Sequence, residues 1–287
     1  MIQPVLKSLA FAMLAVSALA AHAADANVTN AVIAGTGIGN NDFTIGTGLG
    51  IGESRIELGL RARERYGGPG PIFSPTNNTY NNDTNTYNHA AGGFTPIPAT
   101  PNGTSPGPRA SWNFDWSINS NQTGSTTGPN VGAYTYLLSL DTDPGVAINY
   151  FTFNPVNGTT TCSDNSFGNN GTAQGAGVEV SGTTNVPNGK CNAANSVADT
   201  AQYGQLLAAN NLVQNSYNYA FFPSSFAFNP NTTGTYTIML QAFNSDGGDA
   251  LATSLINVNV AAVPEPGSMA LVGLALAGLA VVRRRKV

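Results

Sequence analysis

Apolar and polar residues alternate in several stretches of this chain, which is the pattern of a β-strand that buries one face. The clearest stretch, residues 111–118, reads SWNFDWSI and places both tryptophans on one face and Asp115 on the other. Alternation, or a short apolar run beside a turn, predicts further strands at residues 56–62, 132–141, 146–153, 234–243 and 250–260, and more weakly at 28–33 and 43–45. This repeated period of two favours a fold built from sheets.

Turn sequences separate these predicted strands. Asp143-Pro144-Gly145 and Asp246-Gly247-Gly248 each link two neighbouring strands into an expected hairpin. Short strands joined in this way predict an all-β fold, a single antiparallel β-sandwich of about seven to ten strands. The polar residues 67–108 are expected to form a long loop over its surface, and residues 199–211 are the one predicted helix.

Glycine recurs at every second position in two short stretches, residues 35–39 and 46–52. Nucleotide-binding loops need the spacing GxGxxG between a strand and a helix, and neither stretch has that spacing. We therefore interpret both stretches as turns and strands of small residues.

Charge and composition exclude one class of ligand. Acidic residues outnumber basic residues by 15 to 11, and four of the basic residues are consecutive near the end of the chain. Nucleic acid binding requires clustered lysine and arginine, so residues 24–262 are not expected to bind nucleic acid. Only 9% of the residues are charged, so asparagine, threonine, serine and glycine must provide solubility, as in many secreted β-proteins.

Residues 263–287 combine three features in a fixed order. Pro264-Glu265-Pro266 is followed by an uncharged apolar stretch, residues 267–282, and then by Arg283, Arg284, Arg285 and Lys286. As a transmembrane helix, the apolar stretch would span roughly 24 Å, slightly less than the ~30 Å hydrocarbon core of a membrane. The basic cluster would stay on the cytoplasmic side, which places the preceding residues outside the cytoplasm. An ordinary linker before a membrane anchor is the alternative.

This tail resembles the PEP-CTERM sorting signal of Gram-negative bacteria that produce exopolysaccharide. The resemblance is confined to residues 263–287 and is carried by the Pro264-Glu265-Pro266 motif, the apolar stretch and the terminal basic residues. It implies that an exosortase, a multi-pass membrane transpeptidase, recognises the tail and cuts near the motif. It implies nothing about the fold of the preceding residues.

The other end of the chain has the pattern of a secretory signal peptide. Lys7 precedes an apolar stretch, residues 9–21, and Ala21-His22-Ala23 fits the small-x-small pattern that signal peptidase cleaves, with cleavage expected after Ala23. The predicted segments are a signal peptide (1–23), an exported domain (24–262) and a sorting signal with a transmembrane helix (263–287).

The chain has two cysteines, Cys162 and Cys191, and both lie in the predicted exported domain. Export would place them in an oxidising compartment, so we predict a disulfide between them. Closing a loop of about 30 residues would stabilise the fold by roughly 3–4 kcal/mol. A reactive or metal-binding thiol pair is the alternative, but the spacing matches no zinc or CxxC pattern.

Few residues have the pattern of a catalytic site. His89 is the one histidine of the exported domain and lies in the predicted polar loop, where it is expected to be solvated, and no GxSxG motif provides a nucleophile. Asp115 lies next to Trp112 and Trp116, and aromatic rings beside a carboxylate are typical of sugar sites. The alternation, however, predicts that these rings form the core and that Asp115 points outward.

Two further groups could bind ligands. Arg61, Arg63 and Arg65 would share one face of a strand and could bind acidic sugars, or they could pair with nearby Glu57 and Glu64 on a solvated face. Calcium is a second hypothesis, at Asp141-Thr142-Asp143 and at residues 244–249, although turn chemistry alone explains both sequences.

These observations predict an exported, non-enzymatic surface or matrix protein with a structural or adhesive role, associated with exopolysaccharide. The expected partners are signal peptidase, an exosortase, the membrane before processing, and exopolysaccharide. No catalytic, cofactor-binding or metal-binding residue is predicted. A carbohydrate-binding module and a polysaccharide-acting enzyme are the alternatives.

Overall fold

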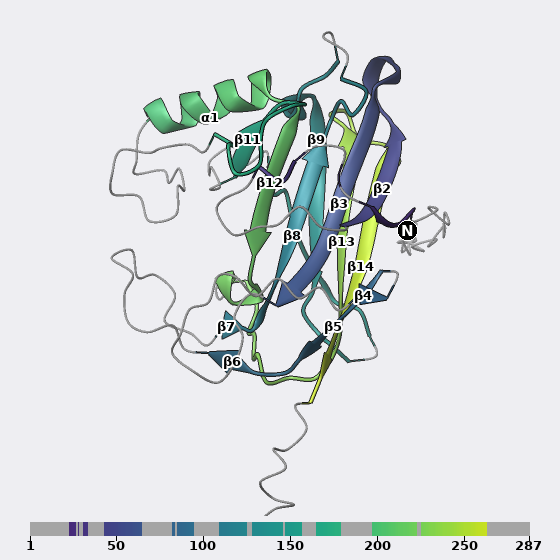
Figure 1. The fold of residues 1–287 in the computed structure, drawn as a ribbon, viewed down its shortest axis with the longest axis vertical. Coiled ribbons are helices and arrows are strands. Elements are labelled where there is room, and N and C mark those ends of the chain that lie inside the picture. The colour runs from purple at the N-terminus through teal and green to yellow at the C-terminus, as the bar shows by residue number, and fades with distance from the viewer. Residues whose placement is uncertain are drawn as a thin grey trace, which may run out of the picture.

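The protein is described by a computed structural model in which two β-sheets pack face to face (Figure 1). The first sheet has the order β1 (Ala23–Ala26), β2 (Phe43–Leu49), β3 (Arg55–Glu64), β8 (Trp112–Asn119), β12 (Leu212–Tyr217) and β11 (Ser166–Gly168). The second has the order β10 (Tyr150–Phe153), β9 (Tyr134–Asp141), β13 (Gly234–Asn244), β14 (Ala252–Ala261), β5 (Thr86–Ala90) and β4 (Asn82–Asp83). A two-stranded sheet pairs β6 (Gly93–Phe94) with β7 (Arg109–Ala110).

One α-helix and three short 3₁₀ turns complete the fold. The helix is α1 (Val197–Ala209), and the turns are η1 (Ile51–Glu53), η2 (Val131–Ala133) and η4 (Tyr219–Phe221). The structure describes residues 23–26, 28, 31–33, 43–64, 82–83, 85–94, 109–124, 128–145, 147–156, 165–178, 197–222 and 225–262. Among these residues, no helix is both long and apolar enough to cross a membrane.

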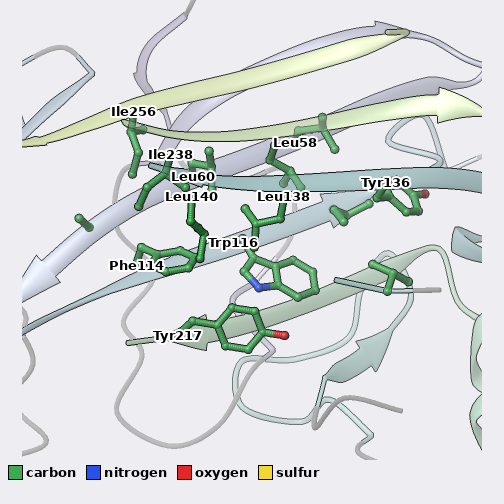
Figure 2. Close-up of a cluster of buried hydrophobic side chains, with 14 of the residues drawn as sticks. Leu58, Leu60, Phe114, Trp116, Tyr136, Leu138, Leu140, Tyr217, Ile238 and Ile256 are labelled. Carbon is green, nitrogen blue, oxygen red and sulfur yellow. The ribbon is translucent and has the colours of Figure 1, made fainter. Parts of the chain in front are cut away.

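The main core fills the space between the two sheets. Alternate residues of β3 and β8 face alternate residues of β9, β13 and β14, and Figure 2 shows Leu60, Trp116 and Leu140 within this layer. Burying such large apolar side chains contributes about 1.5–3 kcal/mol each, which makes this layer the main source of stability. The predicted position of the aromatic residues of 111–118 in the core is confirmed.

The all-β prediction is confirmed, but the sandwich is larger than expected and not wholly antiparallel. Its two main sheets have six strands each, and β5 pairs with β14 in parallel. Strands β4, β5 and β6 lie in the stretch 67–108, which was predicted to be a long loop, so that prediction is wrong for these residues. The reason is that the short run of β5 acquires its strand conformation by pairing with β14, a partner far away in sequence.

Local patterns elsewhere predicted the elements well. The hairpins β9–β10 and β13–β14 form as expected, with Asp141 opposite Tyr150 and Ala242 opposite Ala252. Helix α1 begins and ends two residues before the predicted bounds. The weakly predicted strand at 28–33 is described only at Val28 and at residues 31–33, and none of these is in a strand.

Val28 and residues 31–33 lie against the outer face of the first sheet. Val28 and Val32 pack with Phe43 and Ile45 of β2 in a second, smaller apolar cluster. The side chain of Gln214 in β12 accepts a hydrogen bond from the Ile33 N–H at 2.7 Å. Val28 and residues 31–33 therefore cover part of this face.

The glycine repeat of residues 46–52 lets the two sheets touch. A Cβ atom on Gly46 would lie 1.8 Å from the backbone oxygen of Thr253, and one on Gly48 would lie 1.7 Å from that of Leu251. The Ser254 hydroxyl of β14 donates to the Thr44 carbonyl of β2 at 2.7 Å. Only glycine allows this approach of two backbones, so the interpretation as a strand of small residues is confirmed for β2.

The two ends of the sandwich are distinct. One end, which we call the tail end, holds the last residue of β14, Ala261, together with residues 90–92 and the described residues of the β9–β10 turn, 142–145 and 147–149. It is the lower end in Figure 1. The β13–β14 turn lies at the opposite end, because β14 runs the full length of the second sheet.

Candidate functional site

Three charged side chains meet on the covered face of the first sheet. Asp115 of β8 lies directly opposite Arg61 of β3 in the strand register. Its Oδ2 accepts a hydrogen bond from Arg61 Nε at 2.9 Å and another from Arg63 Nε at 2.8 Å. All three side chains are almost fully buried, and the Arg61 guanidinium also lies 4.0 Å from the centre of the Phe43 ring. We call these three residues the Arg–Asp–Arg cluster.

Burial and charge act in opposite directions on the Asp115 carboxyl. Burial by itself raises the pKa of Asp115, but the positive charges of Arg63 and Arg61 outweigh it and hold that pKa below its usual value of 3.8. Asp115 is therefore ionised at neutral pH, and its charge is held between two guanidinium groups.

This cluster corrects two expectations from the sequence. Asp115 does lie on the face opposite the aromatic residues, but it is 2% exposed rather than solvated. Arg61 and Arg63 share a face as predicted, yet both are buried and paired with Asp115, so they form no cationic surface for acidic sugars. Arg65 lies outside the described residues. The cluster is placed to hold β3 against β8 rather than to meet a ligand.

His89 lies in β5 and not in a solvated loop, which corrects a further expectation. It is 6% exposed and stacks on Trp112 with 6.1 Å between the ring centres and 16° between the planes. Its Nε2 has no hydrogen-bond partner among the described residues. Burial lowers the pKa of His89 from 6.5 to about 4, so the imidazole is neutral at pH 7.

Acid is expected to destabilise the protein through His89. The unfolded chain takes up a proton near pH 6.5, whereas the folded chain resists protonation until about pH 4, so stability falls as pH falls across that window. The free energy of unfolding should drop by about 3 kcal/mol between pH 7 and pH 4. Denaturant unfolding at several pH values measures this.

The variant His89→Phe is the control for this pH dependence, because it keeps an aromatic ring against Trp112 but cannot titrate. Its free energy of unfolding should lose most of the slope between pH 6.5 and pH 4. Asp115 acts in a separate window below pH 3.8, because its pKa is lowered in the folded protein and protonation of its carboxylate then removes stability. An unchanged slope in His89→Phe would show that other groups set the acid sensitivity.

The aspartates of the β9–β10 turn hold the backbone of the turn. Asp141 Oδ1 accepts hydrogen bonds from the N–H of Asp143 at 3.1 Å and of Asn149 at 3.0 Å, and Asp143 Oδ1 accepts one from Gly145. In the described part of the chain, no three histidine, cysteine, aspartate or glutamate side chains gather as metal ligands would. Turn chemistry accounts for these carboxylates, and calcium binding stays a hypothesis.

An asparagine network at the end opposite the tail end was not predicted. The Asn211 amide donates to the side-chain oxygens of Asn119 and Asn170, both at 2.8 Å, and Asn119 donates to Asn170 at 3.0 Å. Asn170 in turn donates to the Asn121 carbonyl at 2.9 Å. These residues are scattered over almost 100 positions, so no local pattern could indicate that they meet. The network gives the abundant asparagine a structural use.

The tryptophans cannot form a sugar-binding platform. Trp112 and Trp116 are each 1% exposed and lie in the core. A different group of rings is only half-buried, where η4 and the chain that follows it meet the edge strand β10. It consists of Phe151, Phe153, Phe222 and Phe226, with neighbouring ring centres 5.3–6.0 Å apart, and we call it the aromatic cluster.

Several predicted site residues lie outside the described residues. They are Cys162, Cys191, Pro264, Glu265, Pro266, Arg283, Arg284, Arg285 and Lys286, and the apolar stretch 267–282 lies outside them as well. The disulfide, the transmembrane helix and the three-segment division stay predictions. Ala23, the predicted signal peptidase site, is the first residue of β1.

The tail end joins the sandwich directly to the sorting sequence. Strand β14 ends at Ala261, whose carbonyl accepts a hydrogen bond from the Ala91 N–H at 2.6 Å. Val260 is paired with Gly234 on one side and with His89 on the other. Pro264 follows Ala261 by three residues.

Comparison with known proteins assigns this last part of the chain. Residues 262–286 match the family model of the PEP-CTERM protein-sorting motif. Neither a curated protein nor a solved structure matches the chain. The resemblance predicted from Pro264-Glu265-Pro266 and the residues after it is thereby confirmed, and the motif implies export and sorting by an exosortase to the cell surface. The protein is thus a β-sandwich that carries a PEP-CTERM sorting motif directly behind its last strand.

Proposed function

We propose that this chain is a non-enzymatic structural or adhesive protein of the cell surface or the exopolysaccharide matrix of a Gram-negative bacterium. The observation that carries the proposal is the sorting motif at residues 262–286. The sandwich in front of it supplies a stable body with a small charge content, and signal peptidase and an exosortase are the processing partners.

The use of the polar side chains supports a structural role. Asp115 and His89, the residues that sequence reasoning considered for chemistry, are both buried and packed into the fold. Asp141 is committed to a turn. A polysaccharide-acting enzyme would need two accessible carboxylates facing one substrate, so it would have to use other acidic residues.

The intact mass of the protein recovered from the surface or medium of its host tests this processing. The expected product lacks residues 1–23 and everything beyond the region of Pro264-Glu265-Pro266, because signal peptidase and the exosortase remove the two ends. A variant that lacks residues 263–287 is the control and should not be retained by the membrane. Recovery of the chain with its tail intact through Val287 would contradict sorting and indicate a membrane-anchored ectodomain.

The matrix role needs a separate measurement. The processed protein should co-purify with exopolysaccharide from the host and should be released into the medium by a strain that makes no exopolysaccharide. It should release no sugar from that polymer, and turnover that is lost when one carboxylate is neutralised would overturn the non-enzymatic assignment.

Carbohydrate binding is the second candidate, and the aromatic cluster favours it. Half-buried rings at the surface can stack on sugar rings, whereas the core tryptophans cannot. Under this candidate, Phe222→Ala should abolish binding to purified exopolysaccharide, while Ile148→Ala, an exposed apolar residue of the β9–β10 turn, should leave binding unchanged. Equal binding by both variants would exclude the aromatic cluster as the sugar site.

A further inference from the structure

The sandwich leaves very little chain between its last strand and the sorting motif. Strand β14 ends at Ala261, and the match to the motif begins at the next residue. Only Ala262 and Val263 separate the strand from Pro264. A fully extended chain covers at most about 3.6 Å per residue, so the three steps of chain from Ala261 to Pro264 can span at most roughly 11 Å.

The end of β14 is held by neighbours on both sides. Val260 is opposite Gly234 of β13 and His89 of β5, and its side chain is 2% exposed. Ala261 is opposite Ala90, and its carbonyl is bonded to the Ala91 N–H. Figure 1 shows β5 beside β14 at the tail end. The backbone just before the motif is therefore part of a sheet.

A peptide-cleaving enzyme binds its substrate as an extended strand over several residues on each side of the bond that it cuts, using the backbone groups of that strand. At the end of β14, the Ala261 carbonyl is already engaged by the Ala91 N–H of the neighbouring chain. The same residues cannot make both sets of hydrogen bonds at once. An exosortase that acts near Pro264 would therefore compete with β5 for the end of β14.

We propose that Ala261 and Ala262 belong to the segment that the exosortase binds, and that Ala261 leaves the sheet for processing. This inference rests on the sorting by an exosortase stated above. The processing rate of the folded precursor then follows the fraction of molecules in which the end of β14 is released.

The opening is confined to the last residues of the strand. Ala261 and Ala262 are exposed and carry only a methyl side chain each, so their release uncovers little apolar surface. Val260, Val258 and Ile256 are buried and anchor the rest of β14 in the core. The sandwich thus stays folded while its end is bound.

A spacer inserted between Ala262 and Val263 tests the proposal. About ten glycine and serine residues form a flexible linker that presents the motif without any opening of the sheet. Loss of one backbone hydrogen bond changes such an equilibrium by about 2- to 10-fold, so the spacer should raise the processing rate by that factor in a pulse-chase experiment in the host. The same spacer placed between Gly247 and Gly248, at the opposite end, should leave the rate unchanged.

The variant Ala91→Pro probes the same step without lengthening the chain. Proline removes the N–H that donates to the Ala261 carbonyl, so this variant should also be processed faster than the wild type. In a chain that already contains the spacer, Ala91→Pro should not raise the processing rate further. Processing of the spacer variant at the wild-type rate, or more slowly, would overturn the proposal. If neither the spaced nor the unspaced precursor loses its tail in a host with an exosortase, the sorting assignment fails first and this inference falls with it.

Discussion

Replacement of Asp115 by asparagine should lower the free energy of unfolding by about 3–5 kcal/mol, as measured by denaturant unfolding at pH 7. The variant keeps the shape of the side chain but removes the carboxylate that the guanidinium groups of Arg61 and Arg63 both contact. Both guanidinium groups would remain fully buried, where the loss of a contacting carboxylate is costly. The matched control is Asp246→Asn in the exposed β13–β14 turn, which should change stability by less than about 0.5 kcal/mol.

A triple variant separates the contribution of the buried charges to the free energy of unfolding from the contribution of side-chain packing. Replacing the whole Arg–Asp–Arg cluster with Arg61→Met, Arg63→Met and Asp115→Leu removes all three buried charges together. Apolar replacement of a buried ion cluster is often neutral or stabilising, so this variant should recover most of the stability that Asp115→Asn loses. If Asp115→Asn is as stable as the wild type, the carboxylate is not what holds these arginines in the sheet.

The sequence predicted which residues of β8 share a face, but it could not predict that the face with the Arg–Asp–Arg cluster is covered. Alternation correctly separated the core residues of β8 from Asp115, because a period of two reports which side chains share a face. It says nothing about what lies over the second face. Here residues 31–33 lie against a strand more than 170 positions later in the chain, β12, where the side chain of Gln214 accepts a hydrogen bond from the Ile33 N–H.

Strand β5 is an element that the sequence pattern failed to predict. Its residues, TYNHA, include only Tyr87 and His89 as large inward-facing side chains, and they lie within a long polar stretch. A short run of this kind is weak evidence for a strand, and the parallel partner β14 lies more than 150 positions away. The sorting motif was predictable for the opposite reason, since Pro264-Glu265-Pro266 and the residues after it form one continuous segment that a family model also matches.

Replacement of Gly46 by valine should prevent the two sheets from closing, with a loss of more than about 3 kcal/mol or of cooperative unfolding altogether. The first added atom, Cβ, would overlap the backbone of β14, 1.8 Å from the Thr253 oxygen. Backbone atoms of a central strand cannot rotate away as the end of a flexible side chain can. Thermal unfolding followed by circular dichroism measures the effect.

Two controls show whether space, rather than the loss of a glycine, is the cause. Thr47→Val lies next to Gly46 in β2 but is exposed, so it should change stability by less than about 0.5 kcal/mol. Gly204→Ala in α1 adds a Cβ that meets no atom within 4 Å, and it should stabilise the helix by about 1 kcal/mol.

The backbone angles favour the explanation by space. Among the described residues, the glycines with positive φ include Gly52, Gly92 and Gly124 but neither Gly46 nor Gly48, so the repeat in β2 is not needed for an unusual backbone conformation. What it provides is the absence of a side chain where β2 meets β14. If Gly46→Val is as stable as Thr47→Val, then β2 and β14 are farther apart than this contact requires. If it unfolds while Gly204→Ala is stabilised, the repeat serves to bring the two sheets together along the strand that leads to the sorting motif.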